Sequence, residues 1–174
     1  MHKDADFIAL NIAILTLSDS RSFETDTSGQ LLEESIKAAG HHAAARELCK
    51  DEIYACRAIV SAWIADPAID VIISTGGTGL TRRDSTPEAL KPLFDQVIEG
   101  FGELFRQISY EEIGTSTVQS RTLAGLANQT LIFCLPGSTG ACRTGWERIL
   151  KEQLDSRHRP CNFAAQTRSG EQLS

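Results

Sequence analysis

Short apolar runs alternate with stretches of helical periodicity in the first half of the chain. Residues 12–17 and 71–73 are continuous runs rich in β-branched and aliphatic side chains, typical of strands buried on both faces. Residues 42–49 have a weaker pattern and are expected to form a strand mainly from their position. The stretches between these strands repeat apolar residues at helical spacing. The order strand, helix, strand, helix, strand, helix predicts a parallel sheet covered on both faces.

The second half predicts more helices and an antiparallel pair of strands. A helix should start at Thr86, as N-cap, with Pro87 at its first position, and run to about residue 95 with an interruption near Pro92. Further helices are expected from Gly100, over 114–121 and around Trp146. Residues 123–126 and 130–135 read as strands joined near 128–129.

These elements predict an α/β protein with three layers, αβα. Its sheet should be doubly wound and mostly parallel, with an antiparallel strand at the edge. We expect an N-terminal arm over residues 1–10, one domain over 11–156 and a polar C-terminal tail over 157–174. A chain of 174 residues is long enough for one domain with a sizeable core.

A glycine-rich loop follows the apolar run at 71–73. Its sequence, STGGTG at 74–79, frees the backbone for unusual conformations and can present several N–H groups to an anion. Arg82, Arg83 and Asp84 follow, and they could accommodate a phosphate and its metal. Taken alone, such a loop could also be a simple turn between a strand and a helix.

The better-known glycine motifs do not fit this loop. No Gly-Lys-Ser/Thr follows it, so it is not a P-loop, and Arg82 occupies the last glycine position of any GxGxxG register from Gly77. Pro136 stands two residues before Ser138, so there is no GxSxG nucleophile elbow.

Three other polar segments should meet the glycine loop at one edge of the sheet. They are SDS at 18–20, the segment before Asp51, and PGS at 136–138. In doubly wound sheets, ligands bind beyond the carboxyl ends of the strands, which is where all four segments fall. DTSG at 26–29 should cap a helix, and that helix N-terminus offers a second anion site.

The composition limits the kinds of binding partner that we expect for this chain. The net charge is −6, so the chain lacks the basic surface that nucleic-acid binding requires, and a phosphate site must be a local pocket. The five cysteines form no CxxC pair, which favours reduced thiols. No apolar stretch approaches ~20 residues and the N-terminus lacks a signal-peptide pattern, so we expect no membrane partner and a cytoplasmic location.

Several motifs together resemble one protein family. TGGTGLTRRDSTPEA is similar to the signature of the MoaB/MogA family of molybdenum cofactor biosynthesis proteins, whose fold is shared by the molybdopterin-binding domain of gephyrin. ILTLSDSR, DTSG, GFGELFRQISYEEIGTSTVQSR, LPGSTGACRTGWERIL and RPCNF match as well. The resemblance covers nearly the entire chain, and its last two stretches place it on the MoaB side.

The resemblance implies molybdopterin as ligand and, in active members, MgATP-dependent adenylyl transfer to the molybdopterin phosphate. It implies catalytic and Mg²⁺-binding roles for Asp51 and Asp84, and Arg82 or Arg83 could stabilise the leaving pyrophosphate. The residues expected to bind molybdopterin or its phosphate are Ser18, Thr27, Ser28, Gly29, Thr75, Gly76, Gly77, Thr78, Gly79, Ser109, Pro136, Gly137 and Ser138.

Two other interpretations remain open at this level. The chain could be a non-catalytic carrier that holds molybdopterin, with Asp51 and Asp84 serving only as polar residues at helix starts. An unrelated dinucleotide or flavodoxin-like binder is the weaker alternative, because its fingerprints are missing. The family also implies a homotrimer or, on the MoaB branch, a homohexamer, and contacts with other proteins of the pathway.

Overall fold

A six-stranded sheet forms the centre of the fold. The structure is a computed structural model that describes residues 6–171. The strand order is β2-β1-β3-β6-β5-β4. The bounds are β1 Asn11–Leu17, β2 His42–Cys49, β3 Val71–Thr75, β4 Gln96–Val97, β5 Leu123–Ala127 and β6 Thr130–Leu135. β2, β1, β3 and β6 run parallel, whereas β5 is antiparallel to both β6 and β4.

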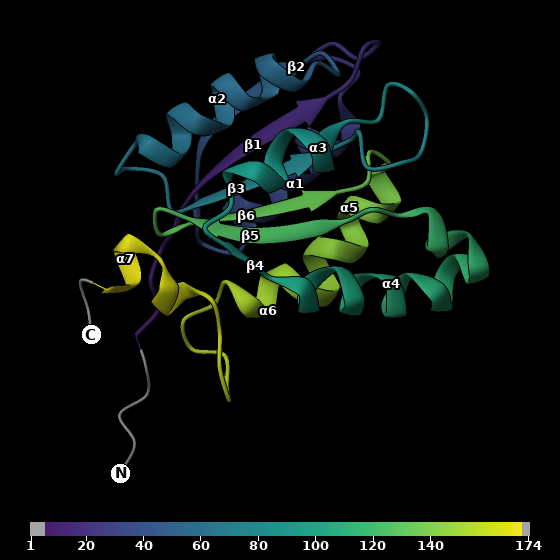
Figure 1. Cartoon of the computed structure of the whole chain (residues 1–174). Coiled ribbons are helices and arrows are strands. Elements are labelled where there is room, and N and C mark those ends of the chain that lie inside the picture. The colour runs from purple at the N-terminus through teal and green to yellow at the C-terminus, as the bar shows by residue number, and fades with distance from the viewer. Residues whose placement is uncertain (1–5, 172–174) are drawn as a thin grey trace.

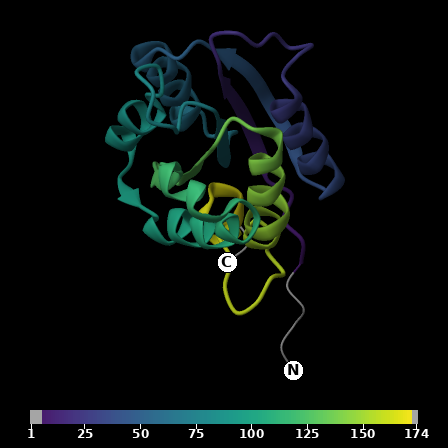
Figure 2. The ribbon, with the colours of Figure 1, turned by 90° about the vertical axis from the view of Figure 1, so that its right-hand side faces the viewer.

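Helices cover both faces of this sheet (Figures 1 and 2). One face carries α1 (Thr27–Ala38), α4 (Glu99–Ile113) and α5 (Thr139–Gly145), the last continued by a π-helical turn at Trp146–Leu150 and by α6 (Lys151–Gln153). The other face carries α2 (Ile53–Ala65) and α3 (Thr86–Leu90). The two buried apolar clusters lie between the sheet and these helix layers. The predicted three-layer αβα class is therefore confirmed.

The start of α3 differs from the prediction. Its N-cap is Ser85, not Thr86, and Thr86 is the first helical residue. The Thr86 hydroxyl donates instead to the carbonyl of Gly76 at 2.7 Å, so it closes the glycine loop onto the helix. The helix ends at Leu90, before Pro92, and a 3₁₀ turn at Lys91–Leu93 follows.

The antiparallel side of the sheet is larger than predicted. β5 and β6 form the expected hairpin, and its turn residues Asn128 and Gln129 have φ of 48° and 63°. β5 is not the edge, however, because the two-residue strand β4 pairs with it. So short a strand has no periodicity of its own and is stabilised by its neighbour.

Part of the expected C-terminal tail packs on the domain. The ring of Phe163 lies 5.7 Å from that of Phe133, and Ala164 is fully buried. Arg168, in α7 (Arg168–Glu171), donates to the carbonyls of Ile64 and Ile69. In the expected N-terminal arm, Leu10 is buried. Residues 1–5 of that arm and 172–174 of the tail lie outside the described residues.

The strand order places the topological switch point between β1 and β3. The chain passes from β1 to β2 on one side and then crosses to β3 on the other. Loops that leave such a pair of strands diverge and leave a crevice beyond their carboxyl ends, where ligands bind in this class of fold.

No helix among residues 6–171 is long and apolar enough to cross a membrane.

Candidate functional site

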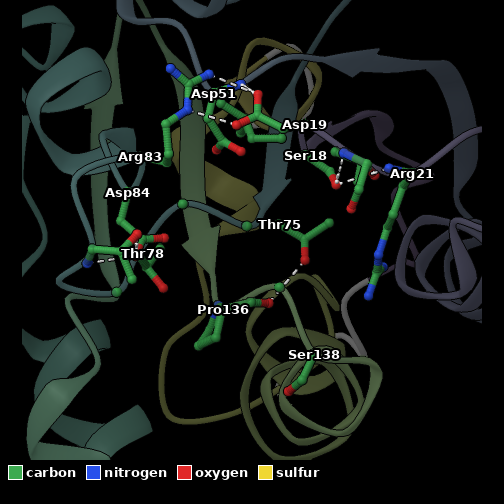
Figure 3. A pocket seen from close by; sticks show the side chains of 18 of the residues that line it. Ser18, Asp19, Arg21, Asp51, Thr75, Thr78, Arg83, Asp84, Pro136 and Ser138 are labelled. Atoms are coloured by element: carbon green, nitrogen blue, oxygen red, sulfur yellow. Dashed lines mark hydrogen bonds and ion pairs between the residues drawn. The ribbon is translucent and has the colours of Figure 1, made fainter.

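A pocket of about 620 Å³ opens at the carboxyl ends of β1, β3 and β6 (Figure 3). Most residues predicted to form a site line it: Ser18, Asp51, Thr75, Gly76, Gly77, Thr78, Gly79, Asp84, Pro136, Gly137 and Ser138. The four polar segments therefore converge as the strand order requires. Arg83 also lines the pocket, whereas Arg82 does not.

Close packing explains the glycines of the first loop. Gly76 has φ of +104°, and a Cβ there would lie 2.2 Å from the carbonyl oxygen of Leu17. Gly77 has φ of +67°, and its Cβ would lie 2.3 Å from Oγ1 of Thr86 and 3.0 Å from Oδ1 of Asp51. Larger residues would push the loop away from the end of β1 and from Asp51.

The glycine loop and the PGS loop are joined directly. Thr75 is still part of β3, and its hydroxyl donates to the carbonyl of Pro136 at 2.9 Å (Figure 3). A Cβ on Gly137 would lie 3.3 Å from Cα of Gly76. The Thr75 hydroxyl is therefore committed to holding the floor of the pocket together.

One carboxylate oxygen of Asp51, Oδ1, is buried without a hydrogen-bond partner among the described residues. Burial, together with the negative charges of Asp19 and Asp84, raises the pKa of Asp51, and Arg83 partly opposes this. Asp51 does not cap α2 either, because Glu52 occupies the N-cap position. Capping therefore does not explain this residue.

Asp84 is held within its own loop. It accepts hydrogen bonds from the backbone N–H and the hydroxyl of Thr81, at 2.9 and 2.7 Å. Burial opposes ionisation, but these hydrogen bonds hold the pKa of Asp84 below its ordinary value. The residue is thus an ionised carboxylate whose orientation is fixed by the turn before α3.

Asp19 connects three of the loops and was not predicted as a site residue. Its carboxylate accepts two hydrogen bonds from Arg83 and one from the backbone N–H of Asp51, the last at 3.2 Å (Figure 3). The bond from Arg83 keeps the pKa of Asp19 low. Its place in SDS, directly after β1, was the available sequence signal.

Arg21, Thr81, Gln119 and Ser120 also line the pocket and were not predicted. Gln119 ends the 3₁₀ extension of α4, Gly114–Gln119, and Ser120 follows it, far along the chain from the other loops. Their only sequence signal was the family-like stretch TSTVQSR. Tertiary packing of the connection before β5 brings them to the pocket.

Four of the residues predicted to bind molybdopterin or its phosphate do not line the pocket: Thr27, Ser28, Gly29 and Ser109. Ser28 is buried behind the PGS loop and donates to the carbonyl of Gly137 at 2.8 Å, while Gly29 donates to the N-cap Asp26. Thr27 contacts Thr139 at the start of α5. Ser109 is buried on α4. The first three support the pocket wall from behind because α1 packs against the PGS loop.

The described residues contain no group of three or more His, Cys, Asp or Glu side chains that could hold a metal ion. A site for Mg²⁺ does not require such a group, since Mg²⁺ is commonly bound by one or two carboxylates together with substrate phosphates and water. Asp51 and Asp84 fit that pattern, and the unpartnered oxygen of Asp51 is the observation that supports it.

Comparison with known proteins identifies the family. The model of the probable molybdopterin binding domain matches residues 13–156. Molybdenum cofactor biosynthesis protein B of Escherichia coli K12 is 60% identical over 158 residues, covering 91% of this chain and 93% of that protein. A crystal structure of a molybdenum cofactor biosynthesis protein B has a TM-score of 0.81 at 43% identity, covering 84% of this chain and 91% of that chain.

A second structure agrees with this result. MoaB from Thermus thermophilus, described as a molybdopterin biosynthesis enzyme, has a TM-score of 0.73 at 34% identity and covers 81% of this chain and 89% of that chain. The pocket at the switch point, the sequence matches and the shared fold all lead to one assignment. The chain belongs to the MoaB/MogA family, on its MoaB side, and its residues 13–156 match the model of the probable molybdopterin binding domain.

Proposed function

We propose that this protein acts in molybdenum cofactor biosynthesis, where it binds molybdopterin and adenylylates its phosphate with MgATP. The names of its relatives support the pathway and the pterin. The adenylyl transfer rests on the pocket itself, and above all on Asp51.

The buried, unpartnered oxygen of Asp51 carries this proposal. Burying a carboxylate oxygen without a hydrogen bond is unfavourable, and a folded protein retains such a group where it has another use. Two further carboxylates, Asp19 and Asp84, raise that cost, as the raised pKa of Asp51 shows. A cation would remove the cost, since carboxylate oxygens are the ligands that Mg²⁺ prefers.

Asp51 and Asp84 would hold the Mg²⁺, which neutralises charge on the phosphates when it is bound. The protein's own contribution is placement. Backbone N–H groups of the glycine loop would orient a phosphate, and the pocket would align the pterin phosphate with the α-phosphorus of ATP. A phosphate oxygen forms the new bond to that phosphorus, and the bond to pyrophosphate breaks.

Purified protein, molybdopterin and MgATP provide the test. We expect stoichiometric release of pyrophosphate and formation of adenylylated pterin. Asp51→Asn and Asp84→Asn should each lower turnover at least ~100-fold, the size found when a group that stabilises transition-state charge is removed. Asp95→Asn is the matched control, because Asp95 lies outside the pocket and accepts a hydrogen bond from the N–H of Asn128 that asparagine can also accept.

A carrier that binds molybdopterin without chemistry is the second candidate. Two observations favour it: Asp84 has a structural role in its turn, and Arg83 is already paired with Asp19. Pterin binding without pyrophosphate release would support the carrier and exclude the transferase. Both functions are compatible with the proposed homotrimer or homohexamer, which light scattering of the purified protein would test, and with a cytoplasmic location.

A further inference from the structure

Arg21 lies on the side of the pocket away from the three carboxylates (Figure 3). Its Nη1 donates to Oγ of Ser28 at 2.9 Å and lies 3.4 Å from Oδ1 of Asp26. Among residues 6–171, no group accepts a hydrogen bond from its Nε or Nη2. One edge of the guanidinium is therefore anchored, while its other donors remain available to the pocket.

The carboxylate beside Arg21 is already neutralised by other groups. Asp26 is buried and accepts hydrogen bonds from the hydroxyl of Thr16 at 2.7 Å, the N–H of Gly29 at 2.9 Å and Nη2 of Arg46 at 3.1 Å. Burial opposes ionisation, but these bonds hold the pKa of Asp26 below its ordinary value. Asp26 thus fixes the position of Arg21 without depending on its charge.

The two sides of the pocket consequently differ in charge. Around Arg21, the ion pairs join three cations, Arg21, Arg46 and Lys37, to two carboxylates, Asp26 and Glu33. Asp26 is buried, and Arg46, Lys37 and Glu33 do not line the pocket, so the charge that this side presents to a ligand is the guanidinium of Arg21.

The opposite side has an excess of negative charge. It combines three carboxylates, Asp19, Asp51 and Asp84, with the guanidinium of Arg83. A polyphosphate that carries a metal ion can bind beside these carboxylates, because the metal offsets their negative charge. An anion without a metal ion is attracted instead to the guanidinium of Arg21.

Neutral donors lie on the same side as Arg21. Ser28, which anchors Arg21, also donates to the carbonyl of Gly137, so the guanidinium is connected to the PGS loop. Oγ of Ser138 accepts from the N–H of Ala141 and keeps its own hydrogen to donate. Arginine, a serine hydroxyl and loop N–H groups are the donors typical of phosphate sites.

We infer that Arg21 binds the phosphate monoester of the pterin, with the PGS loop beside it, whereas the carboxylate side takes the metal-bound phosphates of ATP. This inference rests on the proposed function and assigns the two substrates to opposite sides of the same pocket. Arg21 is a binding residue here, since it donates to the phosphate itself.

Binding of molybdopterin and of its dephosphorylated form to the full chain tests this inference. Without ATP or Mg²⁺, the wild-type protein should prefer the phosphorylated pterin. Arg21→Ala should weaken binding of that form about 10- to 100-fold, the range for one charge-assisted hydrogen-bonded contact, and change binding of the dephosphorylated form less than about twofold. Arg21→Lys, which keeps the charge but loses the planar geometry, should recover part of the affinity.

Arg143→Ala is the matched control, because Arg143 is exposed on α5, outside the pocket. It should bind both forms as the wild type does. Inorganic phosphate added as a competitor should displace the phosphorylated pterin from the wild type. Inorganic phosphate should displace less of the phosphorylated pterin from Arg21→Ala. Displacement from the wild type would show that the site recognises phosphate itself, whereas no displacement would show that it requires the pterin.

Three results would overturn the inference. One is equal weakening of both pterin forms by Arg21→Ala together with a lower melting temperature, which would make Arg21 only an anchor for Asp26. Another is an unchanged preference for phosphate in the variant. The third is a wild type with no preference. If any of these occurs while wild-type protein still forms adenylylated pterin, the proposed function is retained and only the phosphate-binding role of Arg21 is rejected.

Discussion

The guanidinium of Arg83 makes a bidentate contact with the carboxylate of Asp19, with Nε 2.7 Å from Oδ2 and Nη2 2.8 Å from Oδ1. The two residues come from loops that follow β1 and β3, on either side of the topological switch point. The pair therefore links the two loops on either side of the crevice. The pair also uses two donors of Arg83, so a phosphate would have to displace Asp19 in order to bind this arginine.

Asp19→Asn is expected to lower the pKa of Asp51. The negative charge of Asp19 is one of the causes that raise this pKa, and the substitution also leaves Arg83 free to interact with Asp51. A titration of the side-chain carboxyl resonances by NMR would measure the change. Glu103→Gln, an exposed substitution outside the pocket, should leave it unaltered. An equal pKa in Asp19→Asn and wild type would contradict the coupling.

Asp51→Asn is expected to stabilise the protein while it lowers turnover at least ~100-fold. A raised pKa means that the folded state binds the proton more tightly than the unfolded chain, so ionised Asp51 disfavours folding at neutral pH. The melting temperature at pH 7 should rise by about 1–3 °C, as a change below ~1 kcal/mol gives in a chain of this size.

The advantage of Asp51→Asn should shrink in acid. It should decrease as the pH falls through the raised pKa toward the ordinary value of 3.8, because wild-type Asp51 then takes up its proton. Thermal melts of both proteins at a series of pH values would show this. A variant less stable than the wild type at pH 7 would argue against a costly buried charge.

Gly77→Ala is expected to destabilise the fold by about 1–3 kcal/mol. The residue has φ of +67°, and the added Cβ would lie 2.3 Å from Oγ1 of Thr86, which itself donates to Gly76. Urea unfolding would measure the loss. Gly100→Ala is the matched control, since a Cβ there meets no atom within 4 Å. Similar unfolding midpoints for the two variants would refute the packing argument.

Arg121 is expected to position the loop that carries Asp84. Its guanidinium donates to the carbonyls of Gly79 and Asp84, at 2.8 and 3.0 Å, and pairs with Glu88. Arg121→Lys cannot reach these acceptors together, because lysine lacks the planar fork.

We expect this variant to lower kcat about tenfold with a smaller change in KM for the pterin, because Asp84 rather than the Arg21 side is displaced. Steady-state kinetics at saturating ATP would test it. A change confined to stability would instead assign Arg121 a purely structural role.

The sequence determined the class of fold and the place of the pocket. Continuous apolar runs at residues 12–17 and 71–73 are typical of strands buried on both faces, and their alternation with helices predicts a parallel sheet. Once that sheet exists, the polar segments after its strands must share one edge. This is why the SDS, GGTG and PGS loops were placed together from local pattern alone.

Tertiary structure decided what each side chain does at that edge. The two residues of β4 are too few to have a pattern, and only pairing with β5 makes them a strand. Asp51 and Asp84 both stand near helix starts in the sequence, yet one has a buried oxygen without a partner and the other is fixed by Thr81.

The same holds for the cations of the pocket. Arg21 and Arg83 each follow a strand in a polar loop, and the sequence does not distinguish them. Ser28 and Asp26 engage only Nη1 of Arg21, whereas Asp19 engages both Nε and Nη2 of Arg83. Local sequence sets which groups of the loops after the strands reach the pocket, but hydrogen bonds between residues distant in the chain determine which of them remain available to a ligand.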